Sequence, residues 1–169
     1  SGSGNKKSFN KKNLKKISES LKEEQKKYSI YLSGGDTVYS KKLSFTITTV
    51  GFSNRIVLRN KAKINDDIYV TGNLGDSFIG LEILKNKINL NKKLNDYFKE
   101  KYYLPDLKFN LTNKLLSFAN TSIDISDGLI ADLDKLINKQ NLSYKLYLND
   151  IPISKNLKKL IDMKIIKKK

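Results

Sequence analysis

The most informative segment of this chain reads Ile123-Asp124-Ile125-Ser126-Asp127-Gly128-Leu129. Its two aspartates flank the expected end of a short apolar strand, and a helix is expected to follow. Neighbouring carboxylates repel each other unless a cation lies between them, and a helix start offers free backbone N–H groups to an anion. One interpretation is therefore a metal and phosphate site. The other is a helix N-cap made by Ser126 or Asp127, which leaves Asp124 unexplained.

A second loop combines glycines with an acid. Ser33-Gly34-Gly35-Asp36-Thr37 follows the short apolar segment Ser29–Leu32, which is expected to be extended. Two glycines allow a positive φ and a close approach of the backbone to a ligand, and Asp36 can hold a metal that bridges phosphates. A plain turn with a side-chain hydrogen bond from the aspartate is the alternative interpretation.

Two further features are weaker. The segment Thr71–Ser77 resembles a phosphate loop but lacks the lysine and the spacing of a P-loop, so a turn followed by a helix cap is favoured. Arg55 and Arg59 are the only arginines of the chain. Since both are equally rare, rarity alone selects neither of them as functional.

The composition limits the kinds of catalytic and metal site that this chain can form. The 169 residues include no cysteine and no histidine, which excludes disulfides, a thiolate nucleophile, a histidine base and imidazole or thiolate zinc sites. Carboxylates, hydroxyls, amines, backbone N–H groups and hard cations such as Mg²⁺ remain. Absence of cysteine fits a cytoplasmic protein, and no apolar run has the length of a membrane span or a signal segment. Ser1–Gly4 is interpreted as a tag or linker scar.

The formal net charge of +16 comes almost wholly from lysine. The lysines are spread along the chain and are not interleaved with aromatic residues in one segment, and readers of nucleic acid usually rely on arginine for bidentate contacts. A nucleic-acid partner is therefore disfavoured relative to a solvated lysine-rich surface, although a basic field can still attract anionic nucleotides.

Periodicity predicts an alternation of helices and strands. The expected helices are Phe9–Tyr28, Asp76 or Ser77 to about Lys87, Lys92–Lys101, Leu107–Ala119, Leu129–Asn138 and a weak start from Ile153. The expected strands are Leu43–Val50, Ile56–Leu58, Ile68–Val70, Ser122–Ile125 and Ser143–Leu148. This order indicates an α+β or mixed α/β fold with a sheet covered by helices.

The motifs, taken together and in order, resemble the thiamine-monophosphate kinase family. The matching stretches are Gly34–Thr37, Val57–Lys63, Asp67–Ser77 and Ile123–Leu129, and the resemblance extends from about Leu14 to Ser154. This family belongs to a superfamily with aminoimidazole-ribonucleotide synthetase and selenophosphate synthetase. The resemblance implies an N-terminal α/β domain that forms a homodimer, a C-terminal α/β domain beside it, and ATP held between them.

The resemblance also implies domains and roles. Residues 5–55 would be the end of the N-terminal domain, and residues 56–169 most of the C-terminal one. ATP would donate its γ-phosphoryl group directly to thiamine monophosphate, with Mg²⁺ and without a covalent enzyme intermediate. Gly35 and Asp36 match the nucleotide and magnesium loop, and Arg59 and Ser126 match nucleotide contacts. Asp124 and Asp127 match magnesium ligands, so Asp36, Asp124 and Asp127 are the expected catalytic set.

The chain departs from the family pattern in ways that bear on activity. The early Gly-Asp-Asp segment and the late Gly-Gly-Glu-Asp-Tyr-Glu-Leu segment of the family are absent here, and Tyr39 stands where the family often has arginine. We therefore expect this chain alone to be inactive. Two alternatives stay open: another ATP-using enzyme of the superfamily, resembling selenophosphate synthetase, or a non-catalytic basic nucleic-acid-binding domain.

Overall fold

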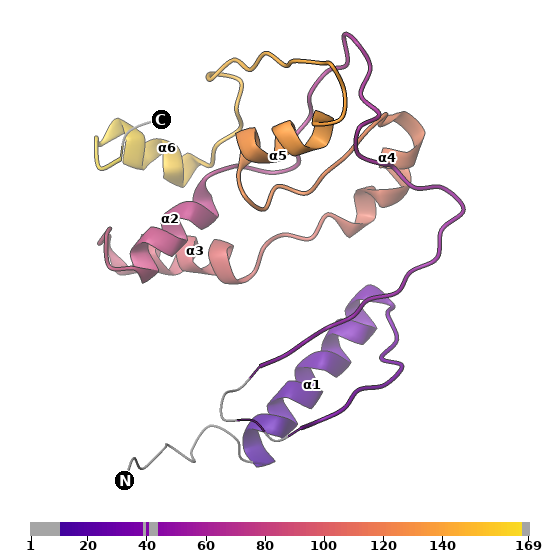
Figure 1. Ribbon diagram of the computed structural model, residues 1–169. Helices are drawn as coiled ribbons and strands as arrows, with labels where there is room; N and C mark the ends of the chain where they lie inside the picture. Colours follow the sequence, from indigo (N-terminus) through magenta and orange to yellow (C-terminus); the bar gives the residue numbers. More distant parts are fainter. Residues whose placement is uncertain (1–10, 39, 41–43, 167–169) are drawn as a thin grey trace. The chain divides into compact units, whose positions relative to one another are not determined.

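A computed structural model describes residues 11–38, 40 and 44–166. The chain divides into two compact units, Ser1–Phe52 and Ser53–Lys169. The first unit contains one helix, α1 (Lys11–Tyr28), which confirms the helix expected there except for Phe9 and Asn10, which lie outside the described residues. Ser29, with a φ of 53°, leaves the helical conformation directly after α1. Residues 30–38 and 44–52 follow as chain without helix or strand (Figure 1).

The second unit holds five α-helices and one short 3₁₀-helix among its described residues (Figure 1). They are α2 (Asp76–Leu84), α3 (Lys92–Tyr103), η1 (Phe109–Leu111), α4 (Thr112–Phe118), α5 (Leu129–Ile137) and α6 (Lys155–Asp162). Four of the expected helices are thus confirmed in place. The predicted helix Leu107–Ala119 is divided, because the N–H of Leu111 bonds to the carbonyl of Lys108 and closes a tight turn before α4.

Helix ends differ from expectation at α2. Neither Asp76 nor Ser77 caps it; the N-cap residue is Gly75, with a φ of 90° and no side-chain bond. The helix stops at Leu84 and not near Lys87, because Asn86 takes a left-handed φ of 58° that does not continue a helix. By contrast, Asn91 and Ser154 cap α3 and α6 by accepting hydrogen bonds from Leu94 and Leu157.

The apolar core lies among α2, α3 and α6. Phe98 and Leu160 are fully buried there, with Ile79, Ile83 and Leu157 beside them. Helices α2 and α3 lie side by side (Figure 1). Their close approach requires a glycine, since a Cβ atom at Gly80 would lie 2.2 Å from the carbonyl oxygen of Phe98.

A buried carboxylate joins the same three helices. Asp76, on the first turn of α2, is 5% exposed. It accepts hydrogen bonds of 2.7 Å from the hydroxyl of Tyr97 on α3 and from the hydroxyl of Ser154, the N-cap of α6. Burial, and then the bond to Asp76, raise the pKa of Tyr97 above its ordinary value. The Tyr97 hydroxyl therefore stays protonated and donates its hydrogen bond to the Asp76 carboxylate.

The described residues form no strand, so the strands expected from alternation are not found there, and Leu43 lies outside the described range. Single hydrogen bonds connect these segments, in place of the ladder of backbone pairs that a sheet would have. Arg55 donates to the carbonyl of Leu116, and the hydroxyl of Thr121 donates to the carbonyl of Leu58. Isolated bonds of this kind tie two segments together without the repeated backbone pairing that defines a sheet.

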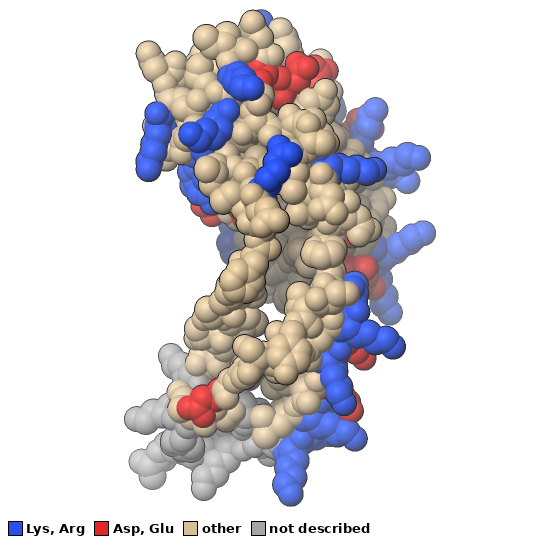
Figure 2. Space-filling view, turned by 90° about the vertical axis from the view of Figure 1, so that its right-hand side faces the viewer, with Lys and Arg blue, Asp and Glu red and all other residues tan. Residues whose placement is uncertain are grey.

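No helix in the described part of the chain combines the length and apolarity needed to cross a bilayer. Lysine side chains stand out from the face shown in Figure 2, along both units, and Asp and Glu are fewer. On this face, the positive side chains of the described residues come from both units.

Replacement of Gly80 by alanine tests the close contact of α2 and α3. Gly80→Ala should lower the free energy of unfolding by about 2 kcal/mol or more, because the added methyl group meets backbone atoms that cannot rotate away. Denaturant unfolding followed by circular dichroism measures the loss. Gly51→Ala is the control, since a Cβ there meets nothing within 4 Å. Equal midpoints for the two variants would contradict the packing described.

Candidate functional site

The aspartate segment, which we define as residues 124–128, precedes α5 and lies in solvent. Asp124 and Ser126 are exposed, and the side chain of Asp127 is 66% exposed. Gly128 is the N-cap of α5 and has a φ of 123°, a conformation that side chains rarely adopt. No side chain caps this helix. The N-cap interpretation of Ser126 and Asp127 is therefore wrong, and both side chains are left to other contacts.

Asp132 holds the aspartate segment in place from within α5. Its Oδ2 atom accepts hydrogen bonds from the backbone N–H groups of Ser126, Asp127 and Gly128, at 2.8, 2.9 and 3.1 Å. Asp132 itself is 1% exposed. The expectation of N–H groups available to an anion concerned the helix start, and of these three groups only the N–H of Gly128, the N-cap of α5, belongs to it; that N–H already donates to a carboxylate of the protein.

A lysine completes this arrangement. Nζ of Lys135 lies 2.8 Å from Oδ1 of Asp132 and also donates to Oδ2 of Asp127. The Lys135 ammonium, helped by the three N–H groups, holds the pKa of Asp132 well below its usual range in spite of burial. Conversely, the hydrogen bonds to Asp127 and then to Asp132 raise the pKa of Lys135. Asp132 and Lys135 are therefore both charged near neutral pH.

Arg59 lies in the same unit as the aspartate segment and is exposed. Its two neighbours fix the main chain on either side. The carbonyl of Leu58 accepts from Thr121, three residues before Asp124, and Asn60 bonds through its N–H to the carbonyl of Leu136 and through Oδ1 to the N–H of Lys139. The main chain at Arg59 is thus tied both to the approach to the aspartate segment and to the C-terminal end of α5.

Gly35 and Asp36 lie in the first unit. Asp36 is exposed, and its Oδ1 accepts from the N–H of the next residue, Thr37, at 2.7 Å; this contact is not the bond to the second residue along that an aspartate turn makes, so the plain-turn alternative is not established by it. Gly34 and Gly35 have no positive φ, and a Cβ at either would meet nothing within 4 Å. Neither glycine is therefore required by the local backbone, and a requirement from a bound ligand stays a prediction.

The structure tests the metal expectation only in part. Asp124 and Asp127 offer the hard oxygen ligands that Mg²⁺ prefers, and Mg²⁺ commonly takes one or two carboxylates together with water and phosphate oxygens. Both side chains are exposed, which leaves room for such ligands. Within the described ranges, no group of three acidic side chains converges on one point. The two side chains are thus of the ligand type that Mg²⁺ takes, and among the described residues they are not part of a closed acidic cage.

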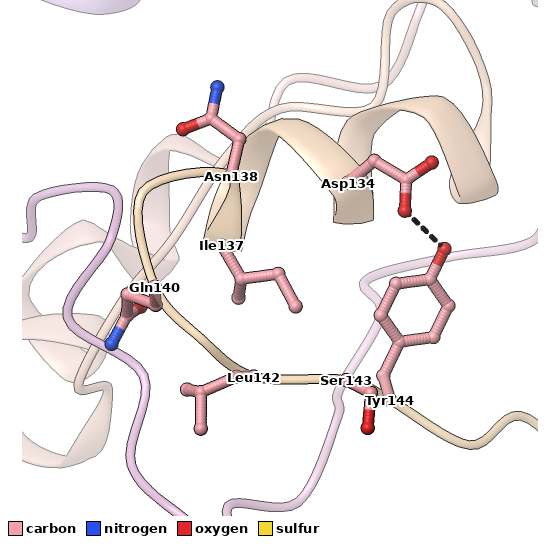
Figure 3. Close-up of a pocket in the computed structure, with 7 residues that line it drawn as sticks. All are labelled: Asp134, Ile137, Asn138, Gln140, Leu142, Ser143 and Tyr144. Atoms are coloured by element: carbon pink, nitrogen blue, oxygen red, sulfur yellow. Dashed lines mark hydrogen bonds between the residues drawn. The ribbon is translucent and has the colours of Figure 1, made fainter.

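A hollow at the other end of α5 is not part of this site. Figure 3 shows it lined by residues from the end of α5 and the chain that follows, and closed on one side by the Tyr144 hydroxyl, which donates to Asp134 at 2.8 Å. The lining residues are Asp134, Ile137, Asn138, Gln140, Leu142, Ser143 and Tyr144. None of the site residues predicted from sequence lines it.

Sequence reasoning missed Asp132 and Lys135. A signal was present, because Asp132 lies between Leu129, Leu133 and Leu136 on the apolar side of an amphipathic helix, with Lys135 three positions on. A charge at a position that a core-facing helix normally fills with an apolar residue indicates a buried partner. The identity of that partner, three backbone N–H groups, depends on how the loop folds back.

Comparison with known proteins confirms the family resemblance. The chain is 42% identical to a thiamine-monophosphate kinase of Buchnera aphidicola (subspecies Acyrthosiphon pisum) over 147 residues, 85% of this chain and 45% of that protein. It is 35% identical to the Escherichia coli K12 protein of the same name over 152 residues, 88% of this chain and 46% of that protein. The corresponding Leptospira interrogans protein is 34% identical over 140 residues. The chain thus spans less than half the length of these relatives, and no protein-family profile matches it.

The low pKa of Asp132 predicts acid sensitivity. Because the folded carboxylate holds its charge to lower pH than the unfolded one, whose pKa is about 3.9, its contribution to stability is complete above that value and is lost as the pH falls below it. The stability difference between the unmodified chain and Asp132→Asn should therefore be constant from about pH 7 to 5 and shrink below about pH 4.

Urea unfolding at a series of pH values measures this difference. Asp134→Asn is the matched control, since Asp134 belongs to the same helix, is exposed and bonds only to the Tyr144 hydroxyl among the contacts described. A stability difference for Asp132→Asn that stays the same through the acid range would contradict the charged hydrogen-bond arrangement.

Proposed function

This chain is a relative of the thiamine-monophosphate kinases along about 85% of its length, and from that premise we propose that it is part of an enzyme that transfers the γ-phosphoryl group of ATP to thiamine monophosphate. The product is thiamine diphosphate. The observation that carries the proposal is the aspartate segment, which presents two carboxylates and a hydroxyl to solvent from a main chain held by Asp132. Phosphoryl transfer depends on positioning and charge neutralisation more than on a strong base, so a chain without histidine is adequate.

The roles of the residues follow from their chemistry. Asp124 and Asp127 would hold Mg²⁺, which when bound neutralises phosphate oxygens and draws the phosphoryl group into line. Ser126 would bond to the nucleotide through its exposed hydroxyl. Because the N–H groups of Ser126, Asp127 and Gly128 already donate to Asp132, the phosphates would be met through the metal and side chains and not through this part of the backbone.

Three further assignments rest on the resemblance. Asp36 is proposed as an additional metal ligand and Gly35 as a nucleotide contact in the complete enzyme. Residues 5–55 are proposed as the end of an N-terminal α/β domain and 56–169 as most of a C-terminal one; the division of the chain between Phe52 and Ser53 supports that boundary. A homodimer acting in the cytoplasm, with ATP and thiamine monophosphate as its substrates, completes the proposal.

The α/β fold belongs to this proposal as well. Segments with strand-like alternation carry large apolar side chains that are exposed in the described residues, among them Phe45, Ile47 and Val50, at 62%, 78% and 78%. Burial of such side chains is the main favourable term in folding. We propose that they are covered by a sheet in the complete enzyme, which is consistent with a chain that spans about 45% of its relatives.

The aspartates are tested in the complete enzyme. Asp124→Asn and Asp127→Asn should each lower kcat by at least about 100-fold, because a neutral amide cannot balance the charge of a metal at the phosphates. A coupled assay of ADP release measures the rate, and Asp134→Asn is the control for loss of one charge. A near-normal rate at ordinary Mg²⁺ would remove the metal role from that residue. This chain alone should give no turnover in the same assay.

Arg59 is tested by its conservative replacement. Arg59→Lys keeps the charge but loses the planar fork that binds two phosphate oxygens together, so the KM for ATP should rise about tenfold while thermal stability stays unchanged. Arg55→Lys is the matched control, because Arg55 donates to the carbonyl of Leu116 and has no proposed contact with nucleotide. An unchanged KM for ATP in Arg59→Lys would refute the assignment.

A further inference from the structure

Lys135 bridges two carboxylates of very different surroundings. Its Nζ atom lies 2.8 Å from Oδ1 of Asp132, whose side chain is 2% exposed. The same ammonium contacts Oδ2 of Asp127, whose side chain is 66% exposed, and the Lys135 side chain itself is 39% exposed. One end of this bridge is therefore shielded from water and the other is open to it.

The two contacts differ in strength for that reason. Asp132 is held by three backbone N–H groups on its other oxygen, so it cannot move away from the ammonium. Charged hydrogen bonds inside the protein are stronger than those in water, whereas ion pairs at an exposed carboxylate contribute little. The ammonium is thus anchored by Asp132, and its contact with Asp127 is the one that can be given up.

We propose that Lys135 is a positioning residue that neutralises Asp127 while no divalent cation is bound and releases Asp127 to the cation when one binds. This inference rests on the proposed role of Asp127 as a Mg²⁺ ligand. A divalent cation and an ammonium repel each other strongly at contact distance, so the two compete for the Asp127 carboxylate. After release, the anchored Lys135 keeps its bond to Asp132, and the backbone of residues 126–128 stays in place.

Competition between the ammonium and the cation predicts the direction in which the affinity for divalent cations changes when the ammonium is removed. Lys135→Met keeps the length of the side chain and removes the competing charge, so divalent cations should bind about threefold to fivefold more tightly, the upper part of the range expected when an exposed ion pair no longer has to be broken. Lys135→Arg retains a cation and should restore the affinity of the unmodified chain. Simple loss of structure would weaken binding and so moves the affinity in the opposite direction.

The matched control is Lys139→Met. Lys139 lies four residues further along, is exposed, and has its backbone N–H but not its ammonium in the contacts described. Lys139→Met removes the same amount of positive charge from the chain as Lys135→Met does. Salt screens this long-range effect, so the affinity for divalent cations should change by no more than about twofold. A difference between the two methionine variants therefore reports the local contact.

The probe is MnCl₂, whose ion accepts the same oxygen ligands as Mg²⁺, titrated into the full chain while electron paramagnetic resonance measures free Mn²⁺. Tighter binding by Lys135→Met than by Lys139→Met, with Lys135→Arg unchanged, supports the proposal. Equal or weaker binding by Lys135→Met, in a chain whose Mn²⁺ binding is abolished by Asp127→Asn, overturns the role of Lys135 and leaves the metal ligand standing. Binding that Asp127→Asn does not affect overturns both.

Discussion

A buried carboxylate must be fully hydrogen-bonded, and the second unit of this protein satisfies that constraint twice. Asp76 takes two hydroxyl donors and thereby joins α2, α3 and the N-cap of α6. Asp132 takes three backbone N–H groups and an ammonium. Since an unpaired buried charge is costly, each aspartate dictates where its partners lie. Asp76 ties three helices together at the edge of their apolar core, and Asp132 holds the aspartate segment.

The second of these carboxylates shapes the candidate site. Because Asp132 supplies the negative charge that the loop N–H groups require, the loop keeps its form without a bound anion. Asp124 is then left as an exposed carboxylate and Asp127 as one that Lys135 contacts, and both are ligands of the kind that a partly hydrated Mg²⁺ takes. A kinase of the proposed type needs such preorganisation more than it needs an acid or a base.

Motifs of the chain alone predict the candidate site residues, whose roles stay proposals. The motifs point to Asp124, Ser126, Asp127 and Arg59, and relatives named thiamine-monophosphate kinase confirm the resemblance to that family. Helices with strong apolar periodicity, such as α3 and α5, were also predicted near their observed positions. The described residues contain no strand, because alternation specifies which face of a segment is apolar, whereas a strand exists only when another segment pairs with it.

The amino-acid sequence alone determined which chemical groups are present: hard oxygen ligands, with no histidine and no cysteine. It also determined the helices whose apolar residues recur at helical spacing. Folding in three dimensions added the relations between distant residues, namely that Asp76 accepts hydrogen bonds from Tyr97 and Ser154, and it decided which loop N–H groups the nearby Asp132 takes. The reason is physical. Propensity and periodicity act over one or two turns of chain, but a buried charge is satisfied by whichever donors the fold brings to it.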